Sequence, residues 1–101
     1  MADTSENYSE TAEALLLANL GFYDTKIPDA LKTYLRSLLN QAYLQLLRTG
    51  IILAPGDLYD DQLQVMYAAW LYRNAGKGLA KPEMLVQEIR NRQVENALYG
   101  A

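Results

Sequence analysis

The chain has 101 residues, of which half are apolar, and a formal net charge of −3, which suits one domain with one modest core. It contains no cysteine and no histidine, so disulfides, thiolate nucleophiles, imidazole bases and the usual zinc ligands are excluded together. Residues 1–10 do not resemble a secretory signal, and the longest apolar run, residues 14–18, is too short to cross a bilayer. We therefore expect a protein made in a cytoplasm, with no cofactor, no metal and no membrane partner.

Charge is unevenly distributed along the chain. Residues 1–30 contain six acidic residues against one basic residue, whereas residues 71–101 contain five basic residues against three acidic ones. An acidic start and a mildly basic end suit head-to-tail contact between copies of the chain. The alternative interpretation is an ordinary solvated surface.

Two helices are predicted in the first half of the chain. Ser9 is a suitable N-cap for a short, leucine-rich helix over residues 9–20. A longer helix is predicted over residues 28–48, because Pro28 suits the first helical position and leucines recur at a spacing of about 3.6 residues. This longer helix is expected to be the spine of the fold.

Four apolar residues, 51–54, separate the second helix from a turn at Pro55 and Gly56. A single strand has no partner elsewhere in the sequence. We interpret residues 51–54 as an extended segment packed on the core. Pairing as a strand with a neighbouring subunit is the alternative.

A third helix is predicted over residues 57–74, with Asp57 as its N-cap. Its main apolar face contains Leu63, Met66, Tyr67, Trp70 and Leu71, and a second apolar face contains Val65, Ala68, Ala69 and Tyr72. A helix with two apolar faces lies either at the centre of its own domain or between two molecules. We expect the second face to contact a neighbouring protomer.

The last part of the chain is predicted to be a loop and a fourth helix. Residues 74–81 contain two glycines and two lysines, which is typical of a mobile basic loop. The fourth helix begins at Pro82, and it is mostly polar after Ile89. Such a helix buries one edge near its start and displays the rest.

These elements predict an all-α fold, a small bundle of four helices with a packed extended segment between helices two and three. A flexible acidic N-terminus over residues 1–8 precedes a single helical domain over residues 9–101. The expected core consists of Leu35, Leu38, Leu39, Leu46, Leu63, Met66, Tyr67, Trp70, Leu85 and Ile89.

No arrangement of residues points to catalysis. The acidic cluster of Asp57, Asp60 and Asp61 stands at a helix start, where carboxylates usually cap, although a cation site is the other interpretation. The segment 76–78 lacks the first glycine and the Ser or Thr of a phosphate-binding loop. An enzyme that relied on Arg and Glu would need an enclosed polar pocket. We expect the protein not to be an enzyme.

Nucleic-acid binding is a more serious alternative. The basic residues of the C-terminal third can contact phosphates, but the chain is acidic overall, and residues 74–81 are long for the turn of a helix-turn-helix motif. A small helical DNA- or protein-binding regulatory module is therefore the second hypothesis.

A set of short motifs lies within residues 57–92. They are Asp60-Asp61-Gln62-Leu63, Met66-Tyr67-Ala68-Ala69-Trp70-Leu71-Tyr72-Arg73, Pro82-Glu83-Met84-Leu85 and Arg90-Asn91-Arg92. In combination these motifs resemble the head–tail connector (adaptor) family of tailed bacteriophages. The leucine-rich helical start of the chain is more loosely similar to that family.

The resemblance implies a structural protein of the virion, located at the head–tail junction, that forms a ring beneath the portal protein. The ring, dodecameric in the virion, joins the portal to a tail or stopper protein and surrounds the channel through which DNA passes without sequence-specific binding. No catalysis and no cofactor are implied. The candidates for contact with copies or partners are Val65, Ala68, Ala69, Tyr72, Arg73, Lys77, Arg90 and Arg92.

Overall fold

The protein folds as four packed α-helices. The computed structural model describes residues 7–22 and 26–99, and no strand occurs among them. The helices are α1 (Glu10–Asn19), α2 (Asp29–Arg48), α3 (Leu58–Asn74) and α4 (Glu83–Tyr99). The predicted all-α class and the four helices are therefore confirmed.

The start of the domain lies close to the predicted boundary. Most of the segment 1–8, which was expected to be flexible, lies outside the described residues. Asn7 and Tyr8 are described, and both contact the fold. The Asn7 carbonyl accepts a hydrogen bond from Gln64 Nε2 at 2.8 Å, and Tyr8 packs against the hydrophobic core.

Side chains fix the starts of two helices. Ser9 Oγ accepts a hydrogen bond from the Ala12 N–H at 3.0 Å and so caps α1. Asp57 Oδ2 accepts from the Asp60 N–H at 3.1 Å and caps α3. Pro28 is the N-cap residue of α2 rather than its first helical residue, and its side chain makes no capping bond.

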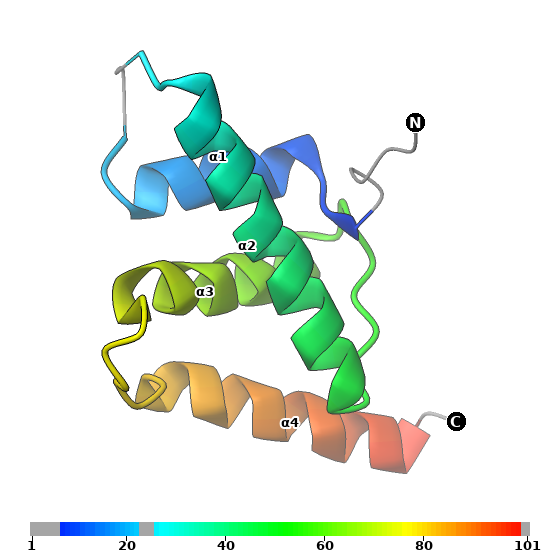
Figure 1. The fold of residues 1–101 in the computed structure, drawn as a ribbon. Coiled ribbons are helices and arrows are strands. Elements are labelled where there is room, and N and C mark those ends of the chain that lie inside the picture. Colours follow the sequence, from blue (N-terminus) through cyan, green and yellow to red (C-terminus); the bar gives the residue numbers. More distant parts are fainter. Residues whose placement is uncertain (1–6, 23–25, 100–101) are drawn as a thin grey trace.

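The helices form two layers (Figure 1). Helices α1 and α3 run side by side in the same direction, α2 crosses both of them, and α4 returns in the opposite direction along α3. The shortest dimension of the molecule is 21 Å, which matches two helix diameters of about 10–12 Å each.

Helix α3 lies at the centre of this arrangement. It is covered by α2 on one side and by α1 on another, so its buried residues come from more than one face. Of the expected core, Leu35, Leu38, Leu39, Leu46, Leu63, Tyr67 and Leu85 are buried. The other expected members, Met66, Trp70 and Ile89, are partly buried and pack against that core.

Residues 51–54 alternate between the core and the solvent. Ile51 and Leu53 are buried, whereas Ile52 is 73% exposed. The Ile51 N–H donates to the Leu46 carbonyl at 3.0 Å, and the Ala54 N–H donates to Asp60 Oδ2 at 2.8 Å. The two ends of the segment are therefore tied to α2 and α3.

Specific hydrogen bonds brace the loop between α3 and α4. Ala75 adopts a left-handed conformation with φ of 36° and ends α3. Asn74 Oδ1 accepts from the Leu79 N–H at 2.6 Å, and Trp70 Nε1 donates to the Ala80 carbonyl at 3.2 Å. These bonds place the start of α4 beside the aromatic side chains of α3.

Candidate interaction surfaces

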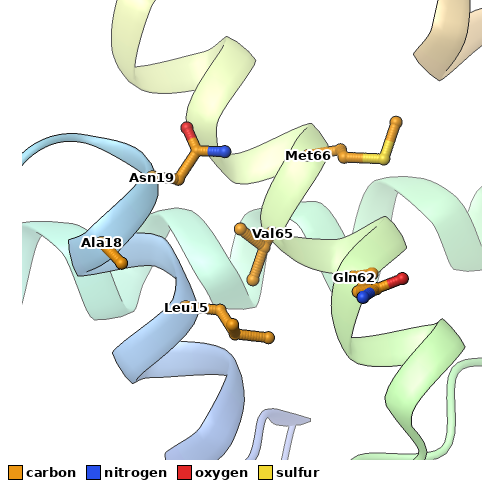
Figure 2. A pocket seen from close by; sticks show the side chains of 6 residues that line it. All are labelled: Leu15, Ala18, Asn19, Gln62, Val65 and Met66. Carbon is orange, nitrogen blue, oxygen red and sulfur yellow. The ribbon is translucent and has the colours of Figure 1, made fainter.

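An apolar groove lies between α1 and α3 (Figure 2). It has a volume of about 420 Å³ and is lined by Leu15, Ala18, Asn19, Gln62, Val65 and Met66. Leu15 points from α1 toward α3, and the Met66 side chain projects away from α1. We call this concave surface the α1–α3 groove.

A second hollow lies between α3 and α4. It has a volume of about 170 Å³ and is lined by Tyr59, Gln62, Leu63, Met66, Met84 and Glu88. Gln62 and Met66 line both hollows. The two hollows therefore lie next to each other, on either side of Gln62 and Met66, and we call the surface that contains both of them the α3 face.

Much of the α3 face is apolar and open. Met84 is 75% exposed and Tyr59 is 71% exposed, although both side chains are large and costly to leave in water. Neither residue was among the interface candidates chosen from the sequence. Met84 belongs to one of the motifs, but its exposure depends on which side of α4 packs against α3. The sequence alone does not show that packing.

The structure corrects the expectation for the small apolar residues of α3. Val65, Ala68 and Ala69 are 5%, 0% and 2% exposed within the single chain. The second apolar face of α3 exists, but helices of the same molecule cover it, with Val65 at the edge of the α1–α3 groove. As folded, Ala68 and Ala69 are therefore not available to a neighbouring protomer, and Val65 is accessible only along the groove.

Tyr72 lies in an aromatic cluster at the end of α3. Its ring is half-buried and stands edge-on to Phe22 with a centroid distance of 6.5 Å. The Tyr34 ring lies 6.2 Å away in a tilted arrangement, and Tyr34 is 43% exposed. Aromatic pairs at such distances contribute about 0.5–1.5 kcal/mol beyond their burial, so Tyr72 has a structural role within the chain.

The four basic candidates have different environments. Arg73 Nη2 donates to the Asn19 carbonyl at 3.1 Å and to Asn19 Oδ1 at 2.9 Å. Arg92 forms ion pairs with Asp60 at 2.7 Å and Glu88 at 3.1 Å. Lys77 and Arg90 are exposed and have no ion pair with any residue that the structure describes. The structure does not bring these four side chains together at one site.

The acidic cluster at the start of α3 organises the fold. Asp61 is 1% exposed, and its carboxylate accepts hydrogen bonds from Ser9 Oγ at 2.8 Å and from the Gly56 N–H at 3.1 Å. Asp57 caps α3, and Asp60 pairs with Arg92. Within the described ranges, no three His, Cys, Asp or Glu side chains are grouped as metal ligands.

Comparisons with protein-family models, curated proteins and solved structures found no significant match. In the part of the chain that the structure describes, no helix has the length and apolar character needed to cross a membrane.

Proposed function

We propose that this chain is a head–tail connector (adaptor) protein of a tailed bacteriophage, a structural protein that forms a ring between the portal and the tail or stopper protein. The ring lies at the head–tail junction of the virion and surrounds the DNA exit channel. The protein has no catalytic role and assembles after synthesis in the bacterial cytoplasm. The motifs within residues 57–92 support this proposal, as does the all-helical fold.

The observation that carries the proposal is the α3 face, a largely apolar surface with two adjacent hollows that the described residues of the chain leave open. Exposed apolar surface of this kind marks a site of contact with another molecule. Met66 connects its two hollows, so one elongated partner surface fits both. In a ring, that partner is the next copy of the same chain.

The opposite layer supplies a suitable second surface. On α2, Leu44 is 51% exposed and Leu47 is 41% exposed, and Figure 1 shows α2 crossing over the layer formed by α1 and α3. Two different surfaces on opposite layers allow a head-to-tail interface, which closes into a ring when the rotation between copies permits. The proposed contact therefore places the Leu44 and Leu47 side of one protomer on the α3 face of the next.

Partner contacts are assigned to the side chains that remain exposed. Lys77 lies in the loop between α3 and α4, and Arg90 lies on α4. The portal or the tail component would meet the ring at these two side chains. Arg73 and Tyr72 contribute indirectly. Arg73 holds the end of α1 in place by its hydrogen bonds to Asn19, and Tyr72 holds Phe22 in place by ring packing. Pairing of residues 51–54 with a neighbouring subunit remains a further proposal for the same ring, since Ile52 is exposed.

Native mass spectrometry of the protein, alone and with the portal protein, tests the proposal. Met84→Glu should abolish the large oligomer, because it places a charge on the α3 face without touching the core. Leu98→Glu is the matched control, because Leu98 is 68% exposed and lines neither hollow. Ile52→Glu separately tests the pairing of residues 51–54. The proposal fails if the unmodified chain remains monomeric both alone and in the presence of the portal protein. If only Ile52→Glu disrupts assembly, residues 51–54 form the interface instead.

The alternative function is a small helical DNA- or protein-binding regulatory module. It is favoured by Lys77, Lys81 and Arg90, which form no ion pair with a described residue. Titration of labelled duplex DNA at several salt concentrations tests the DNA version, since each phosphate contact steepens the salt dependence. Absence of binding at low salt rejects it.

A further inference from the structure

A third hollow lies between the end of α2, α3 and α4, away from the α3 face. It has a volume of about 280 Å³ and is lined by Thr49, Tyr67, Lys81, Val86, Ile89, Arg90 and Gln93. This is just below the range of about 300–1,000 Å³ that is common for small-molecule sites. The hollow therefore has room for one or two side chains of a bound peptide.

The walls of this hollow are held in place by hydrogen bonds. Tyr67 Oη donates to Gln45 Oε1 at 2.8 Å, and Gln93 Nε2 donates to the Thr49 carbonyl at 3.2 Å. Val86, Ile89 and Gln93 lie on one side of α4, because residues three or four positions apart share a helical face. The result is a preformed hollow with apolar walls formed by Val86 and Ile89.

Two cations border the hollow. The Lys81 ammonium lies 4.7 Å from the centre of the Trp70 ring and 5.7 Å from that of Tyr67. The Trp70 indole N–H also donates a hydrogen bond to the Ala80 carbonyl at 3.2 Å. This bond fixes the backbone next to Lys81. Arg90 lies on α4 and is exposed. Neither cation forms an ion pair with any described residue.

Two cations that form no ion pair with a described residue, beside a hollow with two aliphatic walls, favour a ligand with an anionic and an apolar part. A carboxylate that binds Lys81 or Arg90 gains a charge-assisted hydrogen bond, while a neighbouring aliphatic side chain covers Val86 and Ile89. The phosphate backbone of DNA supplies the charge but has no apolar group for these walls. A lysine already positioned by aromatic rings loses little freedom on binding, which favours affinity.

We propose that this hollow is a docking site for an acidic peptide segment of a partner protein, in which carboxylates flank an aliphatic side chain. Lys81 and Arg90 bind the carboxylates, and the aliphatic side chain enters between Val86 and Ile89. The site goes beyond the contact between copies proposed above and does not depend on it, because its residues lie outside the α3 face. Arg90 is the one residue that it shares with the contacts assigned above to the portal or tail component.

Trp70 is the only tryptophan of the chain, so its fluorescence reports on Lys81. The probe is a blocked peptide with the sequence Asp-Glu-Leu-Asp-Glu, titrated into the full chain by fluorescence and by calorimetry. We expect a saturable change in Trp70 emission and an affinity that falls as salt rises. The blocked peptides Asn-Gln-Leu-Asn-Gln and Asp-Glu-Gly-Asp-Glu should bind at least about tenfold more weakly, because each lacks one of the two recognised parts.

Variants locate the site. Lys81→Gln and Arg90→Gln should each weaken binding about fivefold to tenfold by calorimetry, with circular dichroism confirming that both variants remain folded. Lys26→Gln is the matched control, because it removes an exposed cation that does not line the hollow. Equal loss in all three variants, or equal binding of all three peptides, would overturn the proposal. It would also fail if a short DNA duplex bound through Lys81 and Arg90 more tightly than the acidic peptide.

Discussion

Arg92 on α4 and Asp60 on α3 form an ion pair with a distance of 2.7 Å between Arg92 Nη1 and Asp60 Oδ1, and their side chains are only 16% and 15% exposed. Asp60 also accepts a hydrogen bond from the Ala54 N–H, so one carboxylate connects α3, α4 and the segment 51–54. Leu85 is the only fully buried side chain of α4 among the described residues. Polar contacts therefore carry much of the attachment of α4.

Replacing Arg92 should loosen this attachment. Arg92→Met removes the partner of a largely buried carboxylate, and we expect the free energy of unfolding to fall by about 1–2 kcal/mol, between the values for exposed and buried pairs. Urea denaturation measures the change. Arg90→Met is the control, because Arg90 is an exposed arginine of the same helix and should change stability by less than about 0.5 kcal/mol.

The pKa of Arg92 reflects the same contact. Burial by itself lowers this pKa, but hydrogen bonds and charge from Asp60 and Glu88 outweigh that effect and raise the pKa of Arg92 above its ordinary value. The contribution of Arg92 to stability is therefore fully present below the ordinary pKa of an arginine and declines only as the pH rises through the still higher folded pKa. An equal effect of the Arg92 and Arg90 substitutions would contradict a role for the ion pair.

Ser9 and Asp61 should act as one unit. Ser9 Oγ caps α1 and donates to the buried Asp61 carboxylate at 2.8 Å. We expect Asp61→Ala to destabilise the fold by about 2–3 kcal/mol, because the Ser9 hydroxyl and the Gly56 N–H both lose their acceptor. In a double-mutant cycle with Ser9→Ala, the coupling should exceed about 0.5 kcal/mol.

Additive effects of Ser9→Ala and Asp61→Ala would show that the bond between them contributes nothing measurable. Asp57→Ala is the companion variant, since Asp57 is exposed and only caps α3. Its expected cost is about 1 kcal/mol, with no coupling to Ser9.

A substitution at the end of α3 should stabilise the protein. Ala75 has a φ of 36°, and the left-handed conformation costs a non-glycine residue about 1–2 kcal/mol. Ala75→Gly should raise the free energy of unfolding by about 0.5–1 kcal/mol after the greater freedom of glycine in the unfolded chain is counted. Thermal denaturation measures this gain.

The same substitution inside a helix provides the control for Ala75. Ala97 is an exposed residue of α4, and Ala97→Gly should destabilise the protein by up to about 1 kcal/mol. Effects of the same sign at both positions would mean that strain at Ala75 does not matter.

Stability should decline in alkali because of Tyr67. Burial raises the pKa of Tyr67 above its ordinary value of 10.0, so the folded state keeps a proton that the unfolded state releases. The contribution is fully present below pH 10.0 and is lost as the pH rises through the folded pKa. Urea denaturation from pH 9 to 11 should show this decline as a falling midpoint.

Tyr67→Phe should make that alkaline decline shallower, although it lowers stability at neutral pH by removing the hydrogen bond to Gln45. Tyr59→Phe is the matched control, because it removes the hydroxyl of an exposed tyrosine on the same helix. An identical alkaline decline in the Tyr67 variant would assign the effect to other groups.

The local structure of this protein is largely contained in its sequence. Ser9 and Asp57 are helix-capping residue types at the positions where α1 and α3 begin, and the leucines of α2 recur at the helical period. These signals act between residues three or four positions apart, so they identify helices without knowledge of the rest of the fold. The family resemblance and the function drawn from it remain predictions.

The tertiary structure alone decided what covers each surface. The periodicity of α3 marks Val65, Ala68 and Ala69 as apolar, but it contains no information about which molecule covers them, and the chain itself does so. In the same way, the sequence shows Arg92 as one more C-terminal cation. The fold pairs Arg92 with Asp60, whereas Lys81 and Arg90 form no ion pair with a described residue. Packing between distant segments determines these environments, because hydrophobic burial is not directional and is satisfied by any helix that fits.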